Sequence, residues 1–240
     1  MNIFDLPVLS ALLAAATAAL AVLGTIVTPG GAIVLVTIAV RAALIPAGIS
    51  MARAEVARRR LAPRLAELQK RWRRNPARLR RETLALYAAE KVSPYAGFLP
   101  ALAQAPVLTL VYAAFVSPTV AGAPNPLLET TFFGAELGRR VGDLIAGIAV
   151  SDLVFAVLIA ALVVVAVLAR RAARRMAAQA PAPAGPAADQ AVLIARVVGL
   201  VPFLTVVAAL FVPLAASLYL VVSSTWSLVE RPLLRRYVTG

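Results

Sequence analysis

The sequence predicts an all-α integral membrane protein, with a five-helix transmembrane core and a cytosolic helical hairpin between the first and second core spans. Two observations carry this prediction: the apolar composition and the uneven distribution of charge. Of the 240 residues, 61% are hydrophobic, and the mean hydropathy is +0.86. A soluble domain would be close to half apolar. At about 20 residues per span, the chain has room for five or six spans and one cytosolic insertion.

The charge of the connecting segments predicts the topology. The stretch 50–93 carries thirteen Lys and Arg residues against four Glu, and 170–190 carries four Arg against one Asp. The tail 230–240 has three Arg against one Glu, whereas 117–147 has two Arg against three acidic residues. Since cytoplasmic loops of membrane proteins are enriched in Lys and Arg, the first three segments are expected in the cytosol and the fourth outside.

Apolar runs and charged connections divide the chain into successive segments. We expect an N-terminal apolar helix at the outer interface over 1–30, a first core span over 31–50, a cytosolic basic helical hairpin over 51–93, a second span over 94–116, an extracytoplasmic loop over 117–144, a third span over 145–169, a cytosolic linker over 170–190, fourth and fifth spans over 191–229, and a cytosolic tail over 230–240. The Ala-rich run 8–27 leaves three interpretations open: an interfacial helix, which we favour, an extra span, or a cleaved signal.

The cytosolic insertion has the pattern of two helices joined by a short turn. Its first apolar stripe recurs at helical spacing, and Asn75–Pro76 then supplies a helix breaker that also suits the start of a second helix. The two stripes expected to face each other are Leu61, Leu65, Leu68 and Trp72 on the first helix and Leu79, Thr83, Leu86 and Tyr87 on the second.

Arg41 lies inside the apolar run "VLVTIAVRAALIP", and its position needs an explanation. An arginine in the middle of a span costs about 2.5–3.5 kcal/mol on insertion scales. In a span over 31–50 it is roughly 15 Å from either end, beyond easy snorkelling to the interface. Three interpretations stand: a snorkelling side chain, a buried ion pair with Asp152, and a hydrated cavity, which we favour.

A hydrated cavity needs further polar side chains beside Arg41. Each Ser or Thr candidate has a competing interpretation, because its hydroxyl can bond back to its own helix. Gln104 is harder to explain in that way, since its amide needs several partners. The residues expected to line the cavity are Arg41, Thr37, Gln104, Ser151, Asp152, Ser217 and Ser223.

The order of these features resembles the short bacterial form of the YidC/Oxa family of membrane protein insertases. The resemblance covers about residues 28 to 236 and starts with an apolar span that holds an arginine and then a proline, Arg41 and Pro46. A basic hairpin and a Pro-rich entry into the next span follow in 61–115, and a closing pair of spans lies in 201–231. The entry motif is carried by Pro94, Gly97, Pro100, Gln104, Pro106 and Tyr112.

The resemblance implies a five-helix core around a water-filled groove that is open to cytosol and lipid and closed to the outside. The positive charge in the groove would attract hydrophilic segments of nascent membrane proteins, whose apolar helices then pass into lipid. We expect a multi-pass protein of the cell membrane, with a C-terminus that the charge of the tail places in the cytosol. Anionic lipids are expected partners, the ribosome and the Sec translocon are candidates, and the working unit is expected to be a monomer. The hairpin residues expected to make cytosolic contacts are Arg58, Arg59, Arg60, Arg64, Lys70, Arg71, Arg73, Arg74, Arg78, Arg80 and Arg81.

The composition weighs against the other function classes. The sequence contains no cysteine and no histidine, which removes disulfides, thiol chemistry, imidazole bases and the usual zinc sites. We therefore expect no enzyme, no catalytic residue, no metal and no cofactor. The alternative function is a small transporter or channel that uses Arg41 as an anion site. That alternative predicts inverted repeats, and the sequence contains no recognisable pair.

Overall fold

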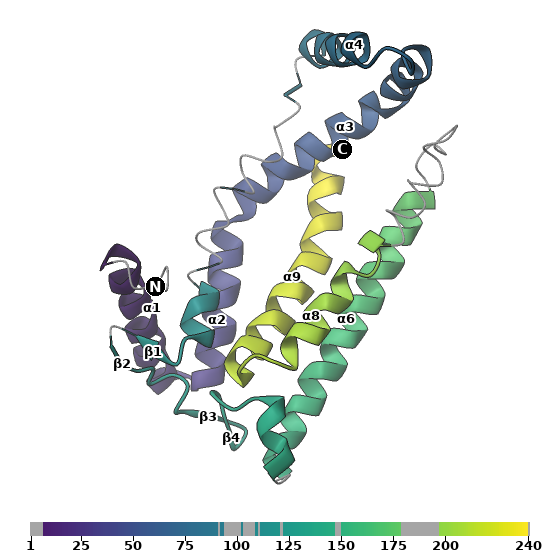
Figure 1. Cartoon of the computed structure of the whole chain (residues 1–240). Helices are drawn as coiled ribbons and strands as arrows, with labels where there is room; N and C mark the ends of the chain where they lie inside the picture. Colours follow the sequence, from purple (N-terminus) through teal and green to yellow (C-terminus); the bar gives the residue numbers. More distant parts are fainter. Residues whose placement is uncertain are drawn as a thin grey trace. The chain divides into compact units, whose positions relative to one another are not determined.

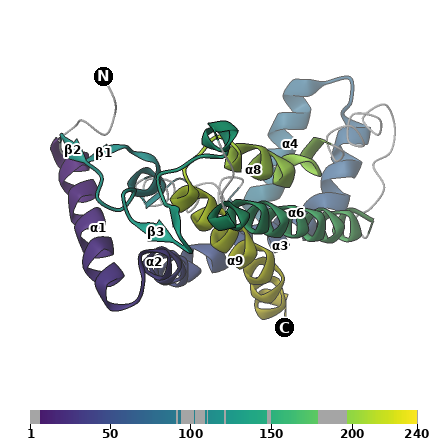
Figure 2. The same cartoon turned by 90° about the horizontal axis from the view of Figure 1, so that it is seen from below.

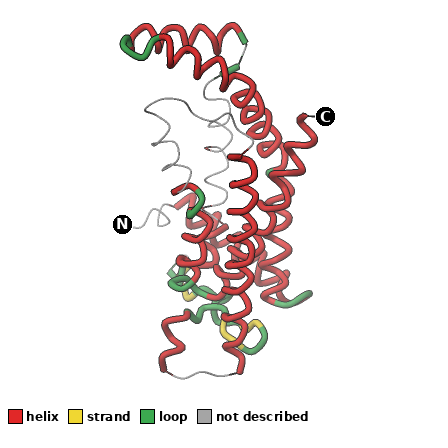
Figure 3. The backbone as a smooth tube through the Cα atoms, turned by 90° about the vertical axis from the view of Figure 1, so that its right-hand side faces the viewer, coloured by secondary structure: helices red, strands yellow, loops and turns green. Residues whose placement is uncertain are grey.

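Helix is the main secondary structure of this protein, for which we describe a computed structural model (Figure 1). The structure describes residues 7–90, 92–93, 102, 109, 111–120, 122–146, 150–178 and 197–239. Within these ranges the strands are two residues long and confined to one loop (Figure 3). The prediction of a mainly α-helical chain is thus confirmed.

The chain divides into two compact units, each of which is described separately. Unit 1 comprises Met1–Ala43, Ala105–Arg171 and Leu200–Leu228. Unit 2 comprises Leu44–Gln104, Ala172–Gly199 and Val229–Gly240.

Unit 1 begins with two helices that pack against each other, α1 (Pro7–Ile26) and α2 (Pro29–Ala43). Leu13, Thr17 and Leu20 of α1 are buried at spacings of four and three, as expected for one face of a helix. The side chain of Thr28 accepts a hydrogen bond from the Gly31 N–H (3.1 Å) and so caps the start of α2. Whether α1 lies at the outer interface stays a prediction.

The segment predicted as one span over 31–50 is two helices. Helix α2 ends at Ala43 and α3 (Ile45–Arg71) begins after a break at Leu44. The reason is Pro46, whose ring clashes with the carbonyl four residues earlier and whose nitrogen carries no hydrogen, so it fits only the first turn of a new helix. Taken together, α2 and α3 are apolar enough to be either one broken span or a re-entrant loop.

The helix in the region of the third predicted span begins later than residue 145 and continues past residue 169. Helix α6 (Leu153–Ala178) follows the 3₁₀ helix η3 (Val150–Asp152) and continues through four arginines that were assigned to a linker. Alanine and arginine are strong helix formers, so the end of the apolar run does not end the helix. Among the described residues, Val150–Ala178 is the single helix long and apolar enough to cross a membrane.

The last two helices of the chain are α8 (Val201–Ala209) and α9 (Leu214–Thr239). Helix α9 continues through residues 230–239, which were assigned to the tail. In unit 1, Tyr219 of α9 is buried against Phe115 and Tyr112, with ring centroids 5.6 and 6.0 Å apart. Together with Leu13 of α1, these rings belong to the hydrophobic core of unit 1.

The loop between the second and third predicted spans folds into two small antiparallel ribbons, which Figure 2 shows next to α1 and α2. Strand β1 (Thr119–Val120) pairs with β2 (Ala123–Pro124), and β3 (Thr131–Phe132) pairs with β4 (Ala135–Glu136). The turn of the second ribbon uses Gly134 at φ +83°, a left-handed conformation that glycine adopts freely. The 3₁₀ helix η2 (Val141–Ala146) follows the second ribbon.

In unit 2, α3 is followed by a short turn and α4 (Pro76–Ala89). The predicted cap is confirmed, since the Asn75 side chain accepts a hydrogen bond from the Arg78 N–H (3.0 Å) and Pro76 opens the helix. The two predicted apolar stripes are also confirmed, because all eight residues are buried or half-buried. On α4 the rest of the helix is exposed apart from Glu82.

Candidate functional site

Arg41 contacts a hydroxyl on a helix far along the chain. It lies two residues before the end of α2, and its Nη2 donates a hydrogen bond to the Oγ of Ser223 on α9. Ser223 is buried and Arg41 is half-buried. Both residues belong to unit 1, so the fold brings together two side chains that the sequence singled out separately.

The charge of Arg41 has no carboxylate partner in the part of the chain that the structure describes. The ion pairs there involve other arginines, and the Nε of Arg41 is buried without a hydrogen-bond partner. An arginine has five N–H donors, so one hydroxyl leaves most of its hydrogen-bonding capacity for a ligand or for water. The site can therefore accept an anionic or strongly polar group.

Two of the predicted hydroxyl residues differ in what they bond. Thr37, one turn before Arg41, is buried, and its Oγ1 donates to the Ile33 carbonyl of its own helix (2.7 Å). The local interpretation therefore holds for Thr37. Ser217 instead donates to the Ala209 carbonyl at the end of α8 (3.2 Å), so its hydroxyl joins two helices.

Asp152 is the third residue of the apolar helix Val150–Ala178, closer to its start than the predicted span over 145–169 implied. It ends η3, directly before α6, and is 4% exposed. Its Oδ1 accepts a hydrogen bond from Nη1 of Arg139 (2.8 Å). Asp152 therefore pairs with Arg139, and the predicted alternative of an ion pair between Asp152 and Arg41 is wrong.

The remaining predicted cavity residues, Gln104 and Ser151, give no further contact with Arg41 among the described residues. Gln104 lies outside the described residues, as do the prolines of the entry motif, and Ser151 is half-buried in η3. In the described part of the chain, no cluster of three acidic residues is arranged to hold a metal ion. The assignment of cavity lining to Arg41, Thr37, Gln104, Ser151, Asp152, Ser217 and Ser223 stays a prediction.

The basic hairpin residues share one property, which is exposure. All eleven predicted contact residues are exposed. Arg59 pairs with Glu55 one turn earlier (3.0 Å), and Arg64 pairs with Glu90, which follows α4. Between Glu67 and Glu82 the chain has seven basic residues and no acidic one. The turn between α3 and α4 is therefore a concentrated positive surface.

Trp72 lies at this turn close to two guanidinium groups. The Cζ of Arg78 is 3.9 Å from the centre of the Trp72 ring, and that of Arg71 is 5.3 Å away. Such cation–π contacts hold the ring in place while leaving the guanidinium N–H groups free to bind anions. We call residues 68–81 the hairpin tip.

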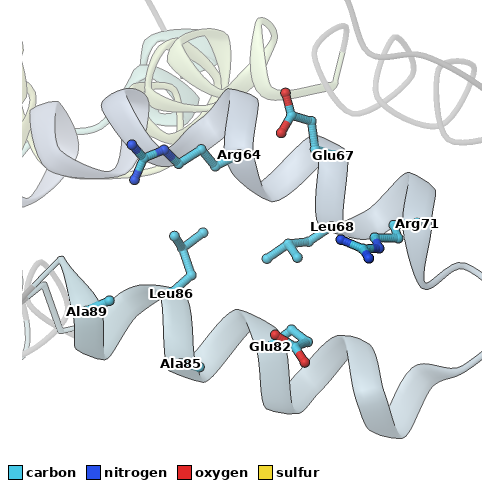
Figure 4. A pocket seen from close by; sticks show the side chains of 8 residues that line it. All are labelled: Arg64, Glu67, Leu68, Arg71, Glu82, Ala85, Leu86 and Ala89. Atoms are coloured by element: carbon cyan, nitrogen blue, oxygen red, sulfur yellow. The ribbon is translucent and has the colours of Figure 1, made fainter.

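A cleft separates α3 from α4 along the hairpin (Figure 4). Its volume is about 520 Å³, and Leu68 and Leu86 point into it from opposite helices. Charged side chains, Arg64, Glu67 and Glu82 among them, line its edges. The apolar stripes thus cover each other only partly.

Sequence reasoning missed two sets of contacts. Glu55 of α3 binds Arg235 of α9 (2.7 Å), a pairing that no local pattern predicts. Asn125 is 1% exposed and bonds three backbone groups, those of Ala114, Ser117 and Leu127. A signal existed for Asn125, because it stands between two prolines, where backbone donors are missing and a side chain must replace them.

A mainly helical fold, one helix long and apolar enough to cross a membrane, and a half-buried arginine without a carboxylate partner among the described residues are typical of a helical membrane protein. A model of the family described as "60Kd inner membrane protein" matches residues 22–239. The chain therefore belongs to this family, the YidC/Oxa family.

Individual relatives are similar over shorter stretches. A protein of Clostridium perfringens named membrane protein insertase YidC is 36% identical over 87 residues, which is 36% of this chain and 37% of the relative. Proteins of the same name from Zymomonas mobilis and Dechloromonas aromatica are 31% identical over 117 residues and 39% over 83. Those stretches are 44% and 35% of this chain but 20% and 15% of the relatives. The chain thus matches well under half the length of these curated relatives.

Proposed function

We propose that this protein is a membrane protein insertase. It draws hydrophilic segments of nascent membrane proteins into a hydrated, positively charged groove around Arg41 and releases their hydrophobic helices to lipid. It acts without covalent chemistry and without a cofactor. The observation that carries the proposal is the contact of Arg41 with Ser223, a neutral hydroxyl, in place of a carboxylate.

The charge of Arg41 gives the groove its selectivity. An arginine already neutralised by a carboxylate would not attract a second anion, whereas Arg41 keeps its charge for a ligand. Although the groove is hydrated, its low-dielectric walls focus the field of this charge and so strengthen the attraction. Acidic segments of a client are therefore held more tightly than neutral ones, and Gln104, Ser217 and Ser223 supply further polar contacts.

The topology follows from the charge of the loops. In this proposal the protein is a multi-pass protein of the cell membrane, with 51–93, 170–190 and the C-terminus in the cytosol and 117–144 outside. The exposed arginines of the hairpin bind anionic lipid headgroups, at about 1 kcal/mol for each basic residue near the surface. The ribosome and the Sec translocon are further partners, and the protein works as a monomer.

The proposal is tested by reconstituting the purified protein in vesicles with two client proteins that differ only in the charge of the translocated tail. Arg41→Glu is expected to reduce insertion of the acidic-tailed client by about tenfold, ~1.4 kcal/mol, and to affect the neutral-tailed client much less. Arg41→Lys keeps the charge and is the matched control. Insertion is measured as protection of the tail from protease.

Three results discriminate between the alternatives. Preferential loss of the acidic-tailed client in Arg41→Glu supports attraction by Arg41. Equal insertion of both clients by this variant contradicts that mechanism. Failure of the unmodified protein to insert either client contradicts the insertase function itself, and anion flux through the same vesicles then favours a transporter or channel.

A further inference from the structure

In unit 2, the thioether of Met176 lies close to two guanidinium groups from other helices. Met176 is in the last turn of α6 and is half-buried, whereas its neighbours Arg175 and Ala177 are exposed. Nη1 of Arg235 on α9 donates a hydrogen bond to the Met176 Sδ. Nη2 of Arg59 on α3 is 4.0 Å from the same sulfur. The ends of α6 and α9 and the middle of α3 therefore meet at one methionine.

The cluster around Met176 is short of hydrogen-bond acceptors. Glu55 binds both guanidinium groups, at 3.0 Å from Arg59 and 2.7 Å from Arg235, so one carboxylate serves two cations. Each guanidinium has five N–H donors and no acceptor, and a thioether sulfur is only a weak acceptor. Because these four side chains carry two positive charges and one negative charge, a further acceptor with partial negative charge would stabilise the cluster.

Arg235 can serve such an acceptor without losing its ion pair. It uses Nη2 for the two carboxylate oxygens of Glu55 and Nη1 for Met176. A stronger acceptor at residue 176 would therefore add a hydrogen bond and take none from the carboxylate. The Arg235 side chain is 23% exposed, compared with 51% for Arg59, so its hydrogen bonds are less weakened by water.

We propose that Met176 is a site of reversible oxidation by peroxides, and that its sulfoxide strengthens the contact of α6 with α3 and α9. The thioether sulfur attacks one oxygen of hydrogen peroxide, so that an S–O bond forms, the O–O bond breaks and water leaves. Sulfur loses two electrons and the peroxide gains them. The sulfoxide oxygen is polar and accepts hydrogen bonds from the guanidinium groups. Hydrogen bonds from a charged donor are about twice as strong as those between neutral groups.

The sign of the effect distinguishes Met176 from an ordinary methionine. Oxidation of a methionine that packs in an apolar core disrupts the core, because it makes the side chain polar. At Met176 the same change supplies the acceptor that Arg235 and Arg59 lack. Met51 provides the comparison within unit 2, since it is half-buried on α3 and no described residue donates a hydrogen bond to its sulfur.

Peroxide treatment of the purified protein in detergent tests the proposal, with peptide mass spectrometry to locate each added oxygen. The chain has three methionines, so the reporter is Met51→Leu and the control is Met51→Leu with Met176→Leu. Leucine replaces methionine at nearly constant volume. Oxidation is expected to raise the melting temperature of the reporter by about 2–4 °C and to leave the control unchanged.

Three results overturn the proposal. The first is a Met176 that stays reduced at a peroxide dose that oxidises free methionine. The second is a melting temperature of the reporter that falls or does not change on oxidation. The third is an equal rise in the control, which assigns the effect to another residue.

Arginine variants in the reporter background test the partners of the sulfoxide. Each variant is compared with its own reduced form, so the loss of the ion pair with Glu55 cancels. Arg235→Ala is expected to abolish the rise, and Arg59→Ala is expected to reduce it. Arg60→Ala is the matched control and keeps the rise, since it removes the same charge from an exposed neighbour of Arg59. Equal rises in Arg235→Ala and Arg60→Ala overturn the role of the guanidinium groups.

Reduction of the sulfoxide completes the test. Methionine sulfoxide reductases act on one sulfoxide epimer each, so a pair of them is added to the oxidised reporter. The melting temperature is expected to return to its starting value as mass spectrometry shows the oxygen being removed. A rise that persists after complete reduction overturns the proposal. No client protein takes part, so this result is independent of the insertion assay and either proposal can fail without the other.

Discussion

Arg235 contacts both carboxylate oxygens of Glu55, although 180 residues separate them in the chain. Its Nη2 is 2.7 Å from Oε1 and 3.0 Å from Oε2. Both residues belong to unit 2, where Gly48 also lies close to Glu230 of α9. Since Glu55 is on α3 and Arg235 on α9, this pair joins the base of the hairpin to the last helix.

The first prediction concerns the strength of this pair relative to a local one. Glu55 also accepts a hydrogen bond from Arg59, whose side chain is 51% exposed, whereas that of Arg235 is 23% exposed. Exposed pairs one helical turn apart contribute about 0.3–0.5 kcal/mol. The less exposed contact with Arg235 is expected to contribute about 1 kcal/mol, at the upper end for such pairs.

Two double-mutant cycles measure the difference by chemical unfolding in detergent. One uses Glu55→Ala with Arg235→Ala, and the control uses Glu55→Ala with Arg59→Ala. The coupling free energy of the first cycle is expected to be the larger, and to fall in about 1 M salt, where the screening length is near 3 Å. A first cycle with no more coupling than the second contradicts the prediction.

The second prediction concerns the close approach of Gly30 and Phe132. Gly30 is buried in the first turn of α2, and a Cβ there meets three atoms of the Phe132 ring within 2.8 Å. Gly30→Ala is therefore expected to destabilise the protein by about 1–3 kcal/mol, because overpacking forces the ring or the backbone to move. Thermal melting of the purified protein measures this change.

Two further variants isolate the clash. In α1, Gly24→Ala places a Cβ 3.4 Å from Pro29, an ordinary contact, and is expected to be stabilising by up to about 1 kcal/mol through helix propensity. Gly30→Ala combined with Phe132→Leu is expected to recover part of the loss. If Gly30→Ala melts at the temperature of the unmodified protein, the ring does not occupy that position.

Features that depend on residues close together in the sequence were predictable, whereas features that depend on distant residues were not. The Asn75 cap and the stripes of the hairpin were predictable, because both depend on residues within a few positions of one another. The break at Leu44 was not predicted, although Pro46 marks it, since hydropathy alone does not register a helix break. The partner of Asp152 was also missed, because a charge in a loop carries no sign of which buried group it will meet.

The third prediction concerns Asn125 as the organiser of the loop that follows helical residues 111–116. Asn125→Ala removes three hydrogen bonds and leaves buried carbonyls unsatisfied, at an expected cost of about 1–3 kcal/mol. Asn125→Asp is expected to be at least as damaging, because a carboxylate has no donor for the carbonyls of Ala114 and Ser117.

The matched control is the exposed asparagine of the hairpin. Asn75 bonds one N–H at a solvent-exposed helix start, so Asn75→Ala is expected to cost about 1 kcal/mol. Thermal melting and the yield of folded protein are compared for the three variants. A smaller loss at Asn125 than at Asn75 refutes the assignment of Asn125 as the organiser.

The fourth prediction concerns the hairpin tip, where Trp72 lies close to Arg71 and Arg78. Arg78 covers the ring at 3.9 Å, so one face of the indole is already occupied and less suited to stacking on a nucleic-acid base. Tryptophan and arginine together suit the headgroup level of a membrane, where the indole is half-buried and the guanidinium groups meet phosphate. We therefore expect Trp72 to contact anionic lipid.

Fluorescence of Trp72 in vesicles measures this contact. The second tryptophan is removed by Trp226→Phe, which loses no hydrogen bond made within the described residues, because Trp226 Nε1 has no partner there. Brominated lipids are expected to quench Trp72 more strongly in vesicles that contain phosphatidylglycerol than in zwitterionic vesicles. With seven basic residues at the tip and about 1 kcal/mol for each near the surface, the difference is expected to disappear in high salt. Equal quenching in both kinds of vesicle, or quenching that salt does not change, contradicts an electrostatic contact.

Replacing Arg73 and Arg74 by Gln tests whether charge causes the quenching. This change leaves the apolar stripes and the contacts of Trp72 with Arg71 and Arg78 intact. Weaker quenching is nevertheless expected, because two positive charges of the hairpin tip are lost.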